Sequence, residues 1–88
     1  MAPVVQITGG PSKGQLVTRT LSNLPVIFQT TLGPIEVLIE EINETDATGD
    51  HFSFVGLVVV GTRTGAQVRG QYDCQGMTGT MTLDLNGS

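Results

Sequence analysis

The sequence predicts an all-β domain, a small antiparallel meander of about seven strands that curls into a barrel or a strongly bent sheet. Groups of turn-forming residues interrupt the chain at intervals of roughly eight to twelve residues, the spacing of all-β folds. Apolar and polar side chains alternate between these groups, and threonine, which suits a pleated sheet, fills many polar positions. The 88 residues are expected to form one domain, 1–88, with a thin core.

Each predicted strand ends at a group of glycine, proline or polar residues, where turns form readily. No linker, low-complexity tract or internal repeat interrupts this order. The predicted strands are Pro3–Thr8, Gln15–Leu21, Pro25–Leu32, Ile35–Asn43, His51–Val60, Ala66–Asp73 and Met77–Leu85, with connections at 9–14, 22–24, 33–34, 44–50, 61–65 and 74–76.

The first connection, Gly9–Gly14, is rich in glycine and contains Lys13, as phosphate-binding loops do. Such a loop needs four residues between its glycines, a Ser or Thr after the lysine, and a helix that follows. Here Gly14 follows Lys13, and the next element is expected to be a strand. The sequence therefore predicts a flexible connection and no nucleotide cofactor.

The segment Ile35–Asn43 is open to two interpretations. Its apolar residues recur at the spacing of a helix, and Pro34 could occupy the first helical position. Four β-branched residues within eight positions favour a strand, and Glu40 and Glu41 would lie at the unfavourable carboxyl end of a helix dipole. We expect a strand.

The connection after it is acidic and could be considered for a metal. Asn43, Glu44, Asp46 and Asp50 supply oxygen ligands, but calcium needs six to eight oxygens, and the twelve-residue loop pattern with its glycine and terminal glutamate is missing. His51 adds a single nitrogen, which is too little for zinc. A solvated acidic turn without a metal is expected.

The strand His51–Val60 carries apolar residues on both faces. Phe54, Val58 and Val60 are expected to point inward, whereas its other valines and Leu57 point outward, and a strand that is apolar on both faces is usually covered on both. The low charged fraction of 14% supports this expectation, and an odd number of strands would leave one without an antiparallel partner in a closed barrel. The predicted self-association face comprises Ile27, Leu38, Val55, Leu57 and Val59, with Glu36, Leu57 and Arg69 in one row as a rim that can pair charges.

Two kinds of cover for this outer face remain open. The first is a second copy of the chain, since exposed apolar patches usually mark contacts. The second is intramolecular, with the amino-terminal segment Met1–Thr8 folded over the face.

The hairpin registers that keep apolar residues on one face place three glycines side by side, Gly56 opposite Gly70 and Gly70 opposite Gly79. Tyr72 is then opposite both Phe54 and Met77. A row of glycines allows the sheet to bend as barrel closure requires. It could alternatively form a notch for a small molecule at the barrel mouth, and the residues of that candidate pocket are Phe54, Gly56, Gly70, Tyr72, Gly79 and Met81.

The last turn raises the only catalytic possibility that the residues suggest. Cys74 would lie near His51 and Asp73, and a thiolate nucleophile needs a histidine within hydrogen-bond reach. Strand alternation points Cys74 inward and His51 outward, so the pair is expected to diverge. The sequence therefore predicts no catalytic residue and no enzyme activity.

Composition limits the partners. The net charge is −4 with four basic residues, so no basic face for nucleic acid can be assembled. The single cysteine excludes an intramolecular disulfide and a cysteine-cluster zinc site. No signal peptide or membrane span is recognised, which makes the cytoplasm the default expectation.

Taken together, the residues predict an acidic, soluble, non-enzymatic β-barrel module that self-associates and serves as a binding or assembly unit, without a cofactor. The alternative is a barrel that binds a small molecule at its mouth, and an enzyme is the least favoured class.

Overall fold

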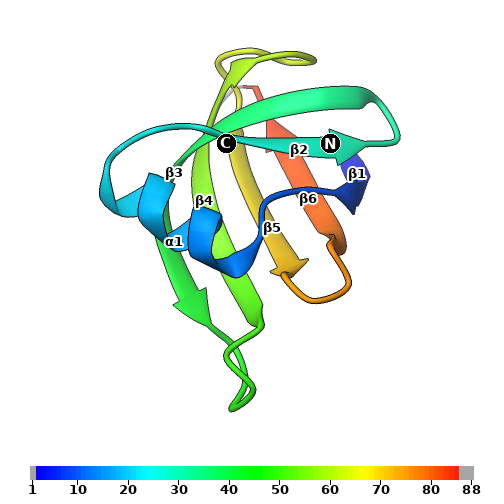
Figure 1. Ribbon diagram of the computed structural model, residues 1–88. Coiled ribbons are helices and arrows are strands. Elements are labelled where there is room, and N and C mark those ends of the chain that lie inside the picture. The colour runs from blue at the N-terminus through cyan, green and yellow to red at the C-terminus, as the bar shows by residue number, and fades with distance from the viewer. Residues whose placement is uncertain (1, 86–88) are drawn as a thin grey trace.

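The computed structural model describes residues 2–85, which form six strands and one helix. Each strand pairs antiparallel with its neighbours in sequence, and the first strand also pairs with the last (Figure 1). The predicted small antiparallel barrel is therefore confirmed. Its elements are β1 (Val4–Gly9), α1 (Lys13–Leu21), β2 (Val26–Thr30), β3 (Gly33–Glu44), β4 (His51–Val60), β5 (Gln67–Asp73) and β6 (Thr78–Asp84).

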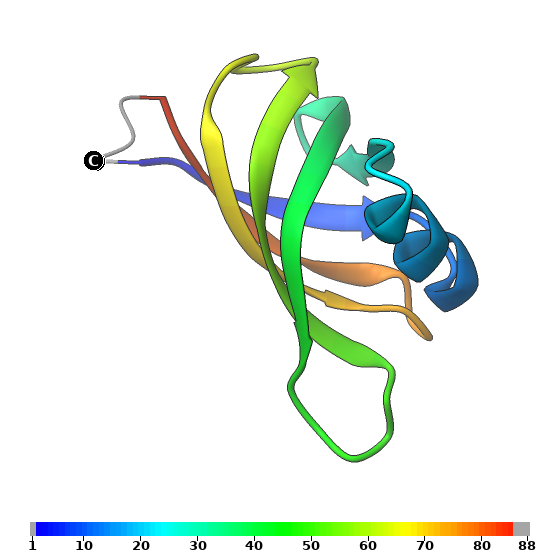
Figure 2. The same cartoon turned by 90° about the vertical axis from the view of Figure 1, so that its left-hand side faces the viewer.

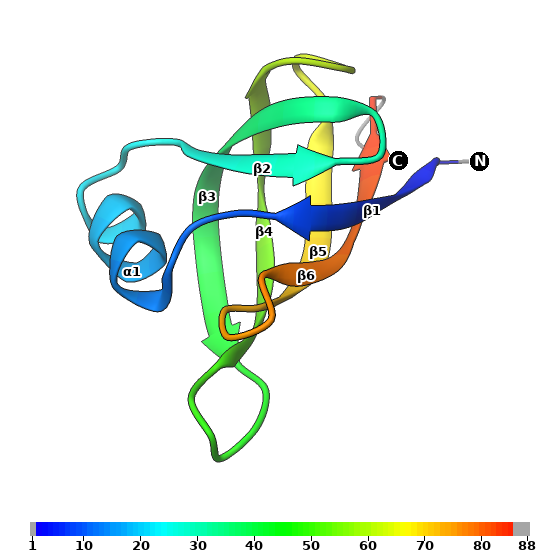
Figure 3. The same cartoon turned by 45° about the vertical axis from the view of Figure 1, so that its right-hand side comes forward.

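Closure of the barrel depends on β1. It lies between β2 and β6, pairing Ile7 with Thr30 on one side and with Gly79 on the other (Figure 3). The prediction of about seven strands is wrong by one element. An even number of antiparallel strands can close into a barrel in which every strand has an antiparallel partner on both sides. No strand of the barrel lacks an antiparallel partner, so the expected unpaired strand, and the support it gave to association, is wrong as well.

The predicted strand that the structure does not contain is Gln15–Leu21, which instead forms most of α1. Ser12 caps the amino terminus, because its hydroxyl accepts a hydrogen bond from the Gln15 backbone N–H at 3.3 Å. Leu16 is the only fully buried residue of this helix. Packing against the core therefore does not impose the alternation of a strand on the valine and threonines of the segment. Local capping therefore overrides the β-branched composition.

The carboxyl end of α1 is a Schellman motif. Asn23 has a positive φ of 58°, its N–H donates to the carbonyl of Thr20, and the Leu24 N–H donates to the carbonyl of Arg19 at 2.8 Å. Pro25 follows and begins the return into the barrel. The pair Ser12 and Asn23, placed just outside the helix, was the signal in the sequence that could have predicted it.

The strand prediction for Ile35–Asn43 is confirmed, and the helix-like spacing within it has a structural origin. Ile35, Val37 and Ile39 alternate into the core, and then Glu40 is an extra residue between the pairs Ile39–Gly56 and Glu41–Val55. This β-bulge advances the inward position by one, so that Ile42 packs against the core.

The three glycines are not side by side, so this part of the register prediction is wrong. Gly56 is opposite Val68, Gly70 is opposite both Phe54 and Met81, and Gly79 is opposite Tyr72. Both hairpins are displaced by two residues from the prediction, which leaves the side chains of the paired residues 51–57, 67–73 and 78–84 on their predicted faces. The glycines are thus staggered diagonally, each beside a larger residue.

Each staggered glycine permits a close approach. A Cβ on Gly70 would lie 2.5 Å from Cζ of Phe54, so the absence of a side chain gives the Phe54 ring its space. Cβ atoms on Gly56 and Gly79 would overlap backbone atoms of the neighbouring strands. The expected role in curvature is consistent with these contacts.

One end of the barrel, here called the helix end, carries α1, the 45–50 loop and the turn after β5 (Figure 2). Leu16 of α1 joins the core there, and the buried Tyr72 hydroxyl donates to the carbonyl of Pro11 at 2.9 Å. Within residues 2–85, no helix is long and apolar enough to cross a membrane.

Candidate functional site

The outer face of β3, β4 and β5 carries the residues of the predicted self-association face; Figure 2 shows the three strands side by side. Leu38 is opposite Leu57, and both are half-buried on the outer face. Val55 is opposite Arg69 on β5 and Glu41 on β3. The structure therefore brings the centre of the predicted face together on adjacent strands.

The face extends toward β2 through more exposed residues. Ile27 is 49% exposed and lies opposite Glu36, which in turn lies opposite Val60. Val60, predicted to point inward, is 55% exposed. The reason is a second bulge, in which Val59 is the extra residue of β4 between the pairs Glu36–Val60 and Val37–Val58. Val60 thereby adds to the apolar face, and sequence alternation alone could not reveal it.

The predicted charged row is wrong in its register. Glu36, Leu57 and Arg69 lie in three successive outer rows instead of one, on β3, β4 and β5 respectively. Leu57 occupies the middle of this diagonal. The two charges therefore flank the apolar centre at opposite corners.

The amino-terminal segment does not cover this face. The described part of Met1–Thr8 forms most of β1, which is a strand of the barrel wall, paired with β2 and β6. It lies three strands away from β4 in either direction around the barrel. Met1 lies outside the described residues. The helix α1 packs against β2 and β3, and a hollow of about 500 Å³ separates part of it from Ile27 and Glu36. The apolar outer face of β4 is left uncovered by residues 2–85.

The candidate ligand pocket is occupied by its own side chains. Phe54, Tyr72 and Met81 are buried, and the ring of Phe28 lies 5.2 Å from those of both Phe54 and Tyr72. The stacked and edge-on arrangements of these rings are favourable aromatic contacts. At the helix end, a Cβ on Gly10 would lie 2.8 Å from the Tyr72 hydroxyl, so the backbone before α1 covers the aromatic cluster. Burial raises the pKa of Tyr72 to about 12.

Cys74 and His51 are oriented as predicted. Cys74 is buried, and its N–H donates to the carbonyl of Asp50 at 2.8 Å. Burial, with the nearby carboxylates of Asp50 and Asp73, raises the pKa of the Cys74 thiol, which disfavours the nucleophilic thiolate. His51 is exposed and makes its contacts on the outer surface.

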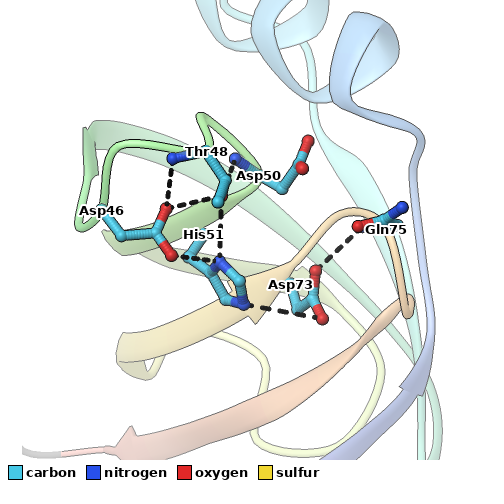
Figure 4. Close-up of polar contacts among 6 residues, drawn as sticks. All are labelled: Asp46, Thr48, Asp50, His51, Asp73 and Gln75. Carbon is cyan, nitrogen blue, oxygen red and sulfur yellow. Dashed lines mark hydrogen bonds and ion pairs between the residues drawn. The ribbon is translucent and has the colours of Figure 1, made fainter.

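His51 is held between two carboxylates (Figure 4). Its Nδ1 lies 2.6 Å from an Asp46 oxygen, and its Nε2 lies 3.7 Å from an Asp73 oxygen. Thr48 donates its hydroxyl hydrogen to Asp46 at 2.7 Å. This hydrogen bond, aided by the charge of His51, lowers the pKa of Asp46. The acidic loop is therefore linked through His51 to the end of β5.

The arrangement around His51 does not suit a metal ion. The two carboxylates approach opposite nitrogens of one ring, so their oxygens and a ring nitrogen do not converge on one point. No group of three or more His, Cys, Asp or Glu suited to a metal occurs among residues 2–85. A hollow of about 430 Å³ beside the ring is lined by Gln71, Thr78 and Thr80 as well as by the cluster. The sequence analysis considered His51 together with the acidic loop, but the contact of its ring with Asp46 depends on how the loop folds.

Comparisons with protein-family models, with curated proteins and with solved structures returned no match to this chain.

Proposed function

We propose that the protein is a non-enzymatic β-barrel module that self-associates through the outer face of β3 and β4 and so acts as an assembly unit. The observation that carries this proposal is the apolar outer surface around Leu57, which no part of residues 2–85 covers. Apolar patches of this kind on small proteins usually mark contacts. The low charged fraction of the chain agrees with a partly buried surface.

The area that a dimer needs to bury is a modest part of the exposed surface. A stable dimer buries about 600 Å² or more on each copy, roughly an eighth of the 4912 Å² of exposed surface. Fully burying an exposed Val, Leu or Ile contributes roughly 1.5–3 kcal/mol before association entropy is subtracted. Leu38 and Leu57 are already half-buried, so on β4 the largest gain comes from Val60, which is 55% exposed.

The packing of the barrel interior supports assembly over the small-molecule alternative. Phe28, Phe54 and Tyr72 fill the region in which a ligand at the mouth would sit, and Pro11 accepts the Tyr72 hydroxyl hydrogen. A small molecule would have to displace these contacts.

The proposal is tested by measuring mass in solution. The unmodified protein should sediment and scatter light as an oligomer at tens to hundreds of micromolar, whereas Leu57→Glu should be shifted toward monomer. Val60→Glu is a second variant at a more exposed site, for which the fold is at less risk. Val4→Glu is the matched control, because Val4 is 65% exposed on β1, across the barrel from β4. A monomeric unmodified protein at several hundred micromolar would contradict self-association.

A further inference from the structure

Glu36 and Arg69 are placed symmetrically about Leu57. Glu36 lies on β3, one outer row from the Leu38–Leu57 pair toward the end of β4, and Arg69 lies on β5, one outer row in the opposite direction. From strand spacing and rise, the two positions are roughly 16 Å apart, with Leu57 at the midpoint. The surface therefore has an acidic corner at Glu36, an apolar centre at Leu57 and a basic corner at Arg69, and Glu41 occupies a third corner on β3 in the same outer row as Arg69.

Such a surface is complementary to a second copy of itself. A two-fold axis that lies in the interface and crosses over Leu57, perpendicular to the line from Glu36 to Arg69, exchanges the two corners. Glu36 of each copy then faces Arg69 of the other, and Leu57 faces Leu57. Symmetric dimers have isologous interfaces of this kind, in which each pair occurs twice.

The curvature of the barrel makes long side chains necessary at these corners. β4 is the crest of a convex surface, and β3 and β5 fall away on either side of it. Two convex surfaces meet at their crests and diverge at their shoulders, where only long side chains can span the gap. Glutamate and arginine are long enough, and arginine can bind a carboxylate through two nitrogens.

Both charges are available to a partner. Neither Glu36 nor Arg69 forms an ion pair or side-chain hydrogen bond with another residue of the described chain. Arg19, which shares a hollow with Glu36, donates its guanidinium hydrogen to the carbonyl of Pro25 at 3.1 Å.

We infer that the oligomer is a two-fold symmetric dimer in which Glu36 and Arg69 form reciprocal intermolecular ion pairs around a Leu57–Leu57 centre. This inference rests on the proposed function and specifies its partner, a second copy of this chain, and its geometry.

The first experiment inverts each charge. Glu36→Arg places arginine opposite arginine twice in a homodimer, and Arg69→Glu places glutamate opposite glutamate twice. Each single variant should raise the dimer dissociation constant at least about tenfold, because opposed like charges are costly at an interface. The double variant E36R/R69E restores opposite charges and should return the dissociation constant to within about threefold of the unmodified value.

The decisive experiment mixes the two single variants. A copy with Glu36→Arg and a copy with Arg69→Glu present opposite charges to each other at both corners, so the mixture should form heterodimers more tightly than either variant forms homodimers. Analytical ultracentrifugation or native mass spectrometry measures this directly. Pairing within one chain cannot produce such a rescue.

Matched controls carry the same charge changes away from the face. Glu44→Arg lies at the far end of β3, and Arg63→Glu lies in the β4–β5 turn, so neither should change the dissociation constant beyond about threefold.

Five outcomes would overturn the inference. A monomeric unmodified protein removes the proposed function together with this geometry. A dimer that is insensitive to both inversions, or whose variants do not rescue each other on mixing, removes only the geometry. Rescue of Arg69→Glu by Glu41→Arg instead of by Glu36→Arg would place the axis elsewhere, and a trimer or larger assembly would exclude the two-fold arrangement.

Discussion

Tyr72 joins two parts of the molecule that lie far apart in the sequence. Its ring packs in the barrel core, while its hydroxyl donates to Pro11 in the segment before α1. The chain has one tyrosine and no tryptophan, so ultraviolet absorbance reports the ionisation of this residue alone. This makes the energetic consequence of its burial measurable.

Folding stability should decrease as the pH rises from about 10 toward 12. The unfolded chain has an ordinary tyrosine pKa near 10, whereas burial raises the pKa of Tyr72 in the fold to about 12. The unfolded state therefore loses its proton first, and the stability present below pH 10 is lost through this interval. Denaturant titrations at a series of pH values, with absorbance near 295 nm, measure both effects.

Tyr72→Phe serves as the control. It removes this tyrosine contribution to the alkaline pH dependence and, at neutral pH, lowers stability by about 1 kcal/mol through loss of the Pro11 hydrogen bond. An absorbance transition of the folded protein centred near pH 10 would contradict the buried environment of Tyr72.

Some side-chain positions could be predicted from the sequence and others could not. The inward Cys74 and outward His51 could be predicted, because alternation along a strand fixes the face of each side chain. The position of Gly70 opposite Phe54 could not, since a register displaced by two residues satisfies the same alternation. What distinguishes the two registers is whether the Phe54 ring has space, which is a property of the assembled core.

Among the elements, α1 depends most on the residues at its ends. It has few buried side chains to fix it, and it includes a glycine, a valine and two threonines, which favour helices weakly. Ser12 and Asn23 complete the hydrogen bonds of the two termini.

Substitution of these capping residues should destabilise the protein in a graded manner. Ser12→Ala should cost about 1 kcal/mol through the lost cap. Asn23→Val should cost more than Asn23→Gly, since φ is 58° at this position and a β-branched residue disfavours positive φ. Urea unfolding measures all three, and equal stability of the valine and glycine variants would show that Asn23 does not end the helix in this conformation.

The acidic loop is tied to the barrel by contacts that depend on charge. Hydrogen bonding to Thr48, followed by the charge of His51, lowers the pKa of Asp46 below its ordinary value of 3.8. The stabilisation is present above that value and is lost as the pH falls through the lowered pKa. We therefore expect the contact between Asp46 and His51 to be lost as the pH falls below about 4.

Nuclear magnetic resonance can follow this change, because the chain has one histidine. In Asp46→Asn, the His51 ring signals should lose the shift that accompanies Asp46 protonation. Asp50→Asn is the control for a carboxylate in the same loop whose side chain forms no ion pair with His51. Identical acid titrations of His51 in the unmodified and Asp46→Asn proteins would contradict the contact.

At the scale of the whole molecule, the number of strands determined which arguments for association hold. The all-β class and barrel were predictable, since turn spacing and alternation extend along most of the chain. Conversion of Gln15–Leu21 to a helix leaves an even number of strands and removes the unpaired edge. The apolar face of β4 then supports association by side chains alone, enlarged by Val60 through a bulge that no periodicity reveals.

Self-association should make thermal stability depend on protein concentration. If only the folded chain dimerises, a tenfold increase in concentration should raise Tm by roughly 3–5 °C for a domain of this size. Leu57→Glu should abolish this dependence, whereas Val4→Glu should retain it. Calorimetry at two concentrations is sufficient, and a constant Tm for the unmodified protein would contradict the dimer.

The seam between β1 and β6 has a consequence for how quickly the barrel forms. Val4 pairs with Thr82, so this contact joins residues from the two extremes of the described chain. The consecutive hairpins of β3 to β6 close short loops, while the seam requires most of the chain to be ordered first. We expect the hairpins to be structured in the folding transition state and the seam to form after it. Substitutions at Ile7 should then mainly accelerate unfolding, and substitutions at Val68 should mainly slow folding.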